Sequence, residues 1–204
     1  MPAYPLHSIA GGYDVKTVIK IVIPLLVILL LLLSAIAKDP LRLFQPHSEQ
    51  LPSQGTTAVY FSPNGGATEA IVNEINSAKS GILVQAYSFT SKPIAKALVD
   101  ARKRGVEIEV VLDRSQRKEK YTSADFVAHA GIPTYIDDKH AIAHNKIMIV
   151  DRSTLITGSF NFTRAAEERN AENLLVIKGN KELVDRYIGN FEEHKGHSEA
   201  YQGK

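Results

Sequence analysis

The chain has 204 residues, of which 44% are hydrophobic and 23% are charged, a composition typical of globular proteins that excludes disordered and collagen-like chains. Lysine and arginine exceed aspartate and glutamate by only two, 24 against 22, so any attraction to phosphate must come from local clusters of charge. The sequence contains no cysteine, which excludes disulfides, thiolate zinc sites and cysteine nucleophiles.

The N-terminal segment, residues 1–37, differs in composition from the rest of the chain. Its run from Ile21 to Ala37 carries no charge and follows two lysines, which is typical of a membrane-targeting segment. Two fates remain open: an uncleaved hydrophobic helix that anchors the protein in the membrane, and a signal peptide cut after Ala37. The length of the run favours the anchor slightly. In both cases we expect an extracytoplasmic, periplasmic or secreted catalytic domain.

Residues 38–56 contain three prolines and many polar side chains, which indicates a linker. From there to the C-terminus, segments with the period of a strand alternate with segments with the period of a helix, which predicts one α/β domain over 57–204. In chain order we expect strands at 57–61, 82–87, 106–112, 134–136, 146–150, 155–158 and 173–177, and helices at 67–78, 92–104, 123–130 and 181–194.

The residues suited to catalysis are concentrated in two stretches. His144 and Lys146 lie two positions apart at the start of a predicted strand, so their side chains share one face. Ile147 and Ile149 point into the core. We therefore expect a polar pair at the edge of a buried sheet.

The second stretch, residues 158–163, shows the same alternation. Ser159 and Asn161 fall on one side, and two phenylalanines fall on the other. Cleavage of a phosphodiester without a metal needs a nucleophile, groups that bind the non-bridging oxygens and an acid for the leaving oxygen. Histidine, lysine, serine and asparagine side chains supply these roles.

Together these residues resemble the signature of the phospholipase D superfamily. Its HxKx4D motif is matched by His144, Lys146 and Asp151, and its GSxN element is matched by residues 158–161. The likeness to short bacterial Nuc-type endonucleases extends from about residue 59 to residue 194. It implies the phospholipase D/nuclease fold, a mixed β-sheet flanked by helices, here preceded by the N-terminal hydrophobic helix.

The resemblance also implies a mechanism. A single copy of the motif implies a homodimer with a shared active site, in which the two His144 side chains meet across a two-fold axis. His144 of one subunit would attack phosphorus to give a phosphohistidine, and His144 of the other would protonate the leaving oxygen. Lys146, Ser159 and Asn161 would bind the phosphate oxygens, while Glu172 would orient the imidazole.

No cofactor and no metal follow from the resemblance. Asp151 lies off the face that His144 and Lys146 share, so we expect it to be a structural partner rather than a catalyst.

A metal site is another possible use of the acidic and histidine side chains near the motif. Two histidines four residues apart are typical ligands only on a helix, and a strand is predicted here, so we expect no metal site. The side chains concerned are Asp137, Asp138, His140 and His144.

The densest basic run in the domain is either a solvated loop or a surface that follows a nucleic-acid backbone or anionic lipid. It consists of Arg114, Arg117, Lys118 and Lys120. The leading interpretation is a metal-independent, nonspecific endonuclease that acts on DNA or RNA. The alternative is a membrane-anchored phospholipase D that hydrolyses a phosphatidyl ester or cardiolipin. A metal-dependent nuclease and a catalytically inactive binding module are further alternatives.

Overall fold

The computed structural model describes residues 15–38 and 54–204. Contacts divide the chain into two compact units, residues 1–50 and residues 51–204. In the first unit the structure describes the helix α1 (Val15–Lys38). Its large apolar side chains between Ile19 and Leu30 are exposed. Among the described residues, no helix combines the length and the hydropathy needed to cross a bilayer.

Parts of the predicted N-terminal organisation lie outside the described residues. These parts are the first fourteen residues of the targeting segment and most of the linker predicted at 38–56. The linker and the targeting segment therefore stay predictions.

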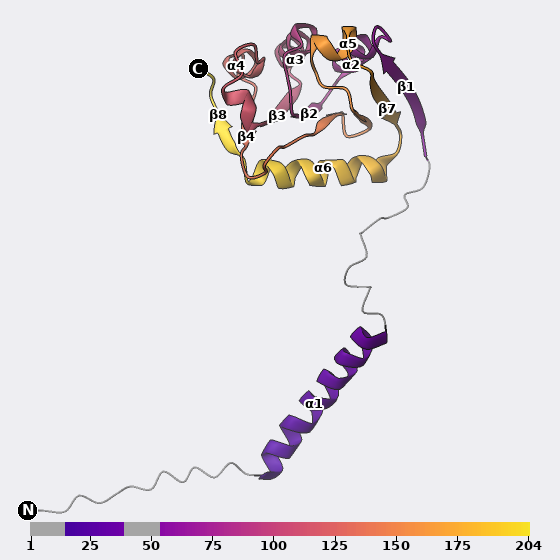
Figure 1. The fold of residues 1–204 in the computed structure, drawn as a ribbon, viewed down its shortest axis with the longest axis vertical. Coiled ribbons are helices and arrows are strands. Elements are labelled where there is room, and N and C mark those ends of the chain that lie inside the picture. The colour runs from indigo at the N-terminus through magenta and orange to yellow at the C-terminus, as the bar shows by residue number, and fades with distance from the viewer. Residues whose placement is uncertain (1–14, 39–53) are drawn as a thin grey trace, which may run out of the picture. The chain divides into compact units, whose positions relative to one another are not determined.

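The second unit contains one eight-stranded mixed sheet with the order β1-β7-β6-β5-β2-β3-β4-β8 (Figure 1). β2, β3 and β4 run parallel to one another, whereas every other neighbouring pair is antiparallel. The bounds are β1 (Thr56–Ser62), β2 (Gly81–Ala86), β3 (Glu107–Asp113), β4 (Thr134–Asp137), β5 (Lys146–Val150), β6 (Thr154–Gly158), β7 (Glu172–Lys178) and β8 (Glu199–Tyr201).

Helices cover both faces of this sheet, as Figure 1 shows. α2 (Ala67–Ser77), α3 (Lys92–Lys103), α4 (Ala124–His129) and α5 (Arg164–Glu168) lie on one face, and α6 (Lys181–Gly196) lies on the other. The larger hydrophobic core lies on the side of α2, α3 and α4, and a smaller one forms under α6. The predicted mixed sheet flanked by helices is confirmed.

Strand β5 differs from the prediction in its environment. Ile147 and Ile149 pack in the core under α6, as expected, but Met148 and Val150 belong to the larger core on the opposite face. All five residues of the strand are buried. β5 is also an interior strand, so the polar pair lies at the end of a central strand and not at the edge of the sheet.

Three short elements are absent from the prediction: α5, β8 and a 3₁₀ helix at Arg114–Arg117. Each is too short to show a hydrophobic period. α5 depends on a cap, because Oγ1 of Thr163 accepts a hydrogen bond from the backbone N–H of Ala166 at 3.1 Å. Beyond Gly158 the chain leaves the sheet instead of continuing as a strand, although both phenylalanines of this stretch are buried as predicted.

The topology gathers the motif residues at one end of the sheet. Because β5 is antiparallel to β2, Lys146 pairs with Ala86, at the carboxyl end of β2. β6 returns beside β5, so Gly158 ends at the same place, and β7 starts there with Glu172. In open α/β sheets ligands commonly bind outside the carboxyl ends of the parallel strands, and the motif residues meet at the carboxyl end of β2.

Candidate active site

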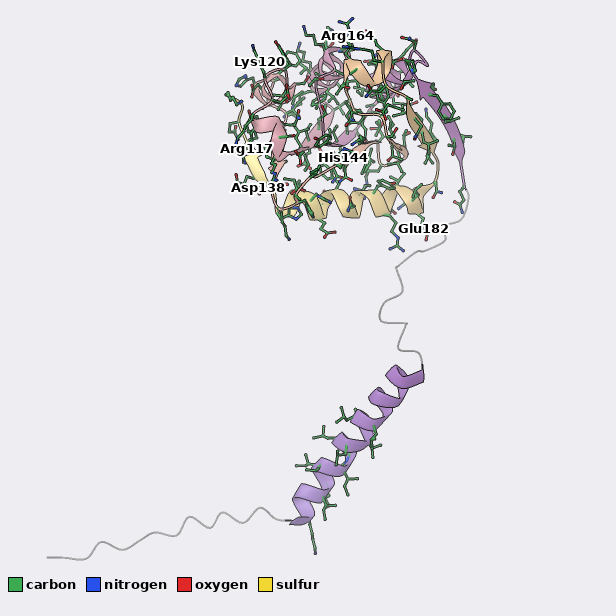
Figure 2. All side chains as sticks on the ribbon, viewed as in Figure 1. Arg117, Lys120, Asp138, His144, Arg164 and Glu182 are labelled. Carbon is green, nitrogen blue, oxygen red and sulfur yellow. The ribbon has the colours of Figure 1, made fainter. Side chains whose placement is uncertain are left out.

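His144 lies in the loop that leads into β5, and the backbone on either side of it is fixed by hydrogen bonds. The N–H of Ala143 donates to Oδ2 of buried Asp113 at 2.8 Å. On the other side, the N–H of Tyr87 donates to the carbonyl of Asn145 at 2.8 Å. The imidazole itself is exposed and lies against the ring of Tyr87, with ring centroids 4.5 Å apart. Figure 2 labels His144 within the second unit. The loop therefore presents an accessible nitrogen nucleophile from a fixed backbone.

Lys146 supplies a buried positive charge next to this imidazole. Its side chain is only 6% exposed, and Nζ donates to the carbonyl oxygen of His144 at 2.9 Å. The same ammonium lies 5.1 Å from the centroid of the Tyr87 ring. Desolvation lowers the pKa of Lys146, and the negative charge of Glu172 partly opposes that shift. A cation held in a site of low polarity attracts an anion more strongly than one in water does.

The backbones of β6 and the start of β7 approach each other closely at Gly158, the glycine of the GSxN element, and leave no room for a side chain there. Gly158 has a φ of 149°, and a Cβ at this position would lie 2.3 Å from the carbonyl oxygen of Asn173. Oγ of Ser159 accepts a hydrogen bond from the N–H of Asn173 at 3.0 Å. Within the described residues, Oδ1 of Asn161 is buried without a hydrogen-bond partner. An unpaired buried acceptor is costly in the free protein and is suited to a group that brings a donor.

Glu172 begins β7 opposite Ser62. Its Oε1 accepts a hydrogen bond from Nδ2 of Asn170 at 3.0 Å, and its charge acts on Lys146. In the described part of a single chain, the carboxylate bonds to Asn170 rather than to His144. The contact with the imidazole that the resemblance implies therefore stays a prediction for the assembled enzyme.

Asp151 lies at the far end of β5 from His144. Its carboxylate accepts hydrogen bonds from the backbone N–H groups of Lys79, Ser80 and Gly81 at 2.7–3.1 Å, and from the Ser80 hydroxyl at 2.8 Å. Burial would raise the pKa of Asp151, but these hydrogen bonds outweigh it and lower that pKa. All of these contacts go to residues 79–81, at the start of β2, which is consistent with a structural role.

A pocket of about 380 Å³ opens beside His144 and Lys146. Gly158 lines one wall, and side chains of α6 line the other. The contribution of α6 is absent from the sequence prediction. Arg186 and Asn190 are four residues apart and so share one face of the helix, which is a signal that the sequence contains. The α6 residues that line the pocket are Arg186, Tyr187 and Asn190.

Three of the four predicted basic residues line a second pocket of about 660 Å³, namely Arg114, Arg117 and Lys118. Tyr87 lines this pocket as well and so connects it to His144. Lys120 does not line it, and its ammonium lies 5.5 Å from the centroid of the Tyr121 ring. The 3₁₀ helix at Arg114–Arg117 carries two of the three basic residues of this pocket.

The fold divides the acidic and histidine side chains near the motif into two groups. Asp137 and His140 lie together, but their neighbours are His194 and His197 of the C-terminal region, not Asp138 or His144. Among the described residues this is the one group with the spacing of a metal site. None of its four members lines the pocket beside His144.

Residues 71–195 match the family model for the cardiolipin synthase PLD-like domain. A phospholipase D of Rickettsia felis is 43% identical over 148 residues, which are 72% of either chain. Human mitochondrial cardiolipin hydrolase is 29% identical over 131 residues, 64% of this chain and 52% of that protein. The crystal structure of Nuc from Salmonella typhimurium, a phospholipase D family member, superposes with a TM-score of 0.71 at 37% identity, covering 74% of this chain and all of that one.

The family model covers more than half of the chain, and its span includes the whole motif, from His144 to Asn161. The fold, the motif and these relatives agree with one another. The chain therefore belongs to the phospholipase D superfamily and is a phosphodiesterase.

Proposed function

We propose that the protein is a metal-independent, nonspecific endonuclease that cleaves the phosphodiester backbone of DNA or RNA through a phosphohistidine on His144. The observation that carries the proposal is the accessible imidazole of His144 beside the buried ammonium of Lys146. A neutral imidazole nitrogen is a nucleophile, and a desolvated cation next to it attracts the phosphate group that it attacks.

The reaction has two steps. An imidazole nitrogen of His144 bonds to phosphorus as the bond from phosphorus to the leaving oxygen breaks, and the leaving oxygen takes a proton from a general acid. Water then attacks phosphorus, the P–N bond breaks, and the general acid, now a base, accepts the proton of that water. Each step is an in-line displacement whose charge rests mainly on the non-bridging oxygens.

The phosphate oxygens would be bound by Lys146, Ser159 and Asn161. Nζ of Lys146 has three donors, of which one goes to the carbonyl of His144, so donors remain for an anion. The Nδ2 group of the Asn161 amide would donate to a further phosphate oxygen. Glu172 would hold the imidazole in the orientation that attack requires.

The mechanism needs two histidines, and the motif supplies one per chain. We therefore propose a homodimer in which His144 of the partner subunit acts as the general acid. No cofactor is required. The N-terminal segment would serve as a membrane anchor or a signal peptide and would place the catalytic domain outside the cytoplasm.

The proposal of a nucleic-acid substrate rests on the surface around the site. Tyr87 is shared between His144 and the basic pocket that contains Arg114 and Lys118. A polymer of phosphodiesters can occupy the catalytic pocket and this basic pocket together, whereas a lipid headgroup fills only the first. Contacts of this kind bind the backbone without reading sequence.

A lipid substrate is the second candidate, favoured by a different surface. An apolar groove of about 810 Å³ lies between α3 and α4, where Tyr121 is 72% exposed and Phe126 is 51% exposed. Lysines of α3 flank it, and an apolar surface with basic neighbours suits an anionic bilayer. One relative is named a mitochondrial cardiolipin hydrolase, which is consistent with this candidate.

The test compares substrates and variants of the full chain, purified in detergent. Wild type, His144→Ala and the control His129→Ala on α4 are assayed on single-stranded and double-stranded nucleic acid and on cardiolipin vesicles. We expect nucleic acid to be cleaved at an initial rate that chelator, added at the start of the assay, does not change. His144→Ala should be inactive and His129→Ala fully active. Turnover of vesicles alone would make the lipid the substrate, and an immediate loss of rate in chelator would make the mechanism wrong.

A further inference from the structure

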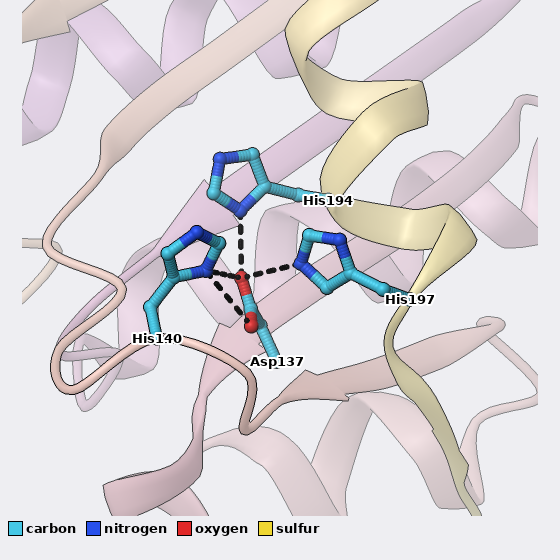
Figure 3. Close-up of side chains that lie close together, drawn as sticks. All are labelled: Asp137, His140, His194 and His197. Atoms are coloured by element: carbon cyan, nitrogen blue, oxygen red, sulfur yellow. Dashed lines mark hydrogen bonds and ion pairs between the residues drawn. The ribbon is translucent and has the colours of Figure 1, made fainter.

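Four side chains from two distant parts of the chain converge beside the loop that carries His144. Asp137 ends β4, His140 follows in the next loop, His194 lies in the last turn of α6, and His197 follows that helix. Figure 3 shows the three imidazoles pointing at the carboxylate from three sides. We call this group the histidine cluster; its candidate ligand atoms lie within 4.8 Å of one another.

The distances from the Asp137 carboxylate to the three imidazoles are close to those between neighbouring ligand atoms of a coordination sphere. Oδ2 of Asp137 lies 3.1 Å from Nδ1 of His140, 2.6 Å from Nδ1 of His194 and 3.3 Å from Nε2 of His197. Ligand atoms about 2.0–2.1 Å from a tetrahedral ion lie about 3.4 Å from one another. The three ring centroids are 4.9–5.4 Å apart, so the rings surround one central point. A small retreat of the carboxylate would place an ion at that point.

The polar atoms of the histidine cluster are not fully satisfied by one another. Asp137 is completely buried. Nε2 of His197 is buried too, and although it lies near Oδ2 of Asp137 it makes no hydrogen bond within the described residues, because the two groups are poorly aligned. Three imidazoles facing one carboxylate oxygen exceed what that oxygen binds well. Each imidazole can carry its proton on the outer nitrogen and present a bare inner nitrogen to a cation.

The charge of the histidine cluster also suits a cation. An ionised carboxylate, here the fully buried one of Asp137, together with three imidazoles in their neutral form would make a ligand set with a net charge of minus one. Such a set is suited to a divalent cation.

We propose that the histidine cluster binds one Zn²⁺ ion in a closed, four-coordinate site. Imidazole and carboxylate are preferred zinc ligands, and four protein ligands leave no position for a substrate or a reactive water, which is typical of a structural rather than a catalytic site. The exposed edge of His140, whose side chain is 45% accessible, gives the ion a path from solvent.

The site would position the catalytic loop. It joins the end of β4 and the loop after it to the C-terminal end of α6, and His140 precedes His144 by four residues. α6 also contributes Arg186 and Asn190 to the pocket beside His144. An ion that holds these two segments together fixes both walls of the active site without contacting the substrate. His140 and His197 are therefore positioning residues.

The ion is tested by its stoichiometry and by stability, neither of which depends on activity. The full chain in detergent is incubated with ZnCl₂, passed over a desalting column and analysed for zinc. We expect about one zinc per chain for the wild type and for His144→Ala. The double variant His140→Gln, His197→Gln should lose zinc affinity by more than the roughly 10–100-fold that loss of an outer contact costs. His129→Gln, outside the cluster, is the matched control and should bind as the wild type does.

Zinc should also raise the melting temperature of the wild type and of His129→Gln but not of the double variant. Cobalt provides a readout of geometry, since Co²⁺ in a tetrahedral site absorbs visible light. Should the double variant be poorly folded by circular dichroism, the single variant His140→Gln, whose side chain is partly exposed, takes its place. Equal zinc in wild type and variant, or no zinc in the wild type, would overturn the proposal. Because His144→Ala abolishes turnover and keeps the ion, failure of this inference is distinguishable from failure of the endonuclease mechanism.

Discussion

The ammonium of Lys146 donates a hydrogen bond to the backbone carbonyl of His144 at 2.9 Å. The residue that would bind the phosphate thus also fixes the backbone of the residue that would attack it. Because Lys146 is almost completely buried, its charge acts in surroundings of low polarity. This contact accounts for the spacing of the HxK motif, because a lysine two residues after the histidine can reach back to the carbonyl oxygen of that histidine.

Lys146→Met should lower kcat by roughly 10²–10³-fold, the usual cost of removing one group that stabilises developing charge. Methionine retains the packing of the aliphatic chain, so the fold should persist. Steady-state kinetics on a phosphodiester substrate checks this, with circular dichroism as the measure of folding. Lys96→Met on α3, an exposed lysine paired with Asp100, is the control and should leave kcat unchanged. A Lys146→Met enzyme with wild-type kcat would contradict the role of the ammonium.

Glu172→Gln should move the alkaline limb of the pH–rate profile to lower pH. Burial lowers the pKa of Lys146, and the charge of Glu172 raises it again in part. Without that charge, Lys146 loses its proton at a lower pH, and activity that needs the ammonium is lost earlier as pH rises. The measurement is kcat/KM against pH for both enzymes. An alkaline limb that stays in place or moves upward would show that the carboxylate does not act on Lys146.

Asp151→Asn should destabilise the protein by about 1–3 kcal/mol at neutral pH while leaving kcat of the folded enzyme near its normal value. Asn tolerates the positive φ of 51° at this position, so the loss reports the weakened hydrogen bonds to residues 79–81. Denaturant unfolding gives the free energy of unfolding.

The effect of Asp151→Asn should depend on pH in one direction. The folded pKa of Asp151 is lowered, so its ionised carboxylate stabilises the fold above the unfolded pKa of about 3.9, and this contribution is lost as pH falls through the folded pKa. The stability difference between wild type and variant should therefore shrink in acid. A difference that grows as the pH falls would contradict this account.

Gly158→Ala should impair both folding and catalysis. The added Cβ would approach the carbonyl of Asn173 to 2.3 Å, and the φ of 149° is one that alanine rarely adopts. Relief of the clash requires β6 and β7 to separate where Ser159 bonds to Asn173. Gly189→Ala on α6, where a Cβ meets no other atom within 4 Å, is the control. Equal melting temperatures for the two variants would show that the close approach is unimportant.

The sequence predicts the parts of the site that are close together in the chain. His144 and Lys146 are two residues apart, and strand geometry places them together without knowledge of the fold. Most strands and helices were predicted within one or two residues of their bounds, because each carries a clear hydrophobic period. The burial of both faces of β5 was not predicted, since Met148 and Val150 are apolar in either environment.

The parts that depend on packing between distant segments were not predictable in this way. Asp137 and His194 are 57 positions apart and meet only because the end of α6 packs beside the end of β4. A local signal for the histidine cluster is the pair His194 and His197, which are three residues apart at the C-terminal end of α6. The sequence pair alone does not predict that these histidines meet Asp137 at the end of β4, because that contact depends on the order of the strands.

The most direct test of the central claim is to trap the covalent intermediate. The full chain is mixed with a phosphorus-labelled phosphodiester, the reaction is quenched in base, where phosphohistidine survives, and peptides are mapped for label. The proposed mechanism predicts acid-labile phosphate on His144 in the wild type and none in His144→Ala, which should also fail to turn over. Turnover by the wild type with no label on His144 at any quench time, or full activity in His144→Ala, would contradict it.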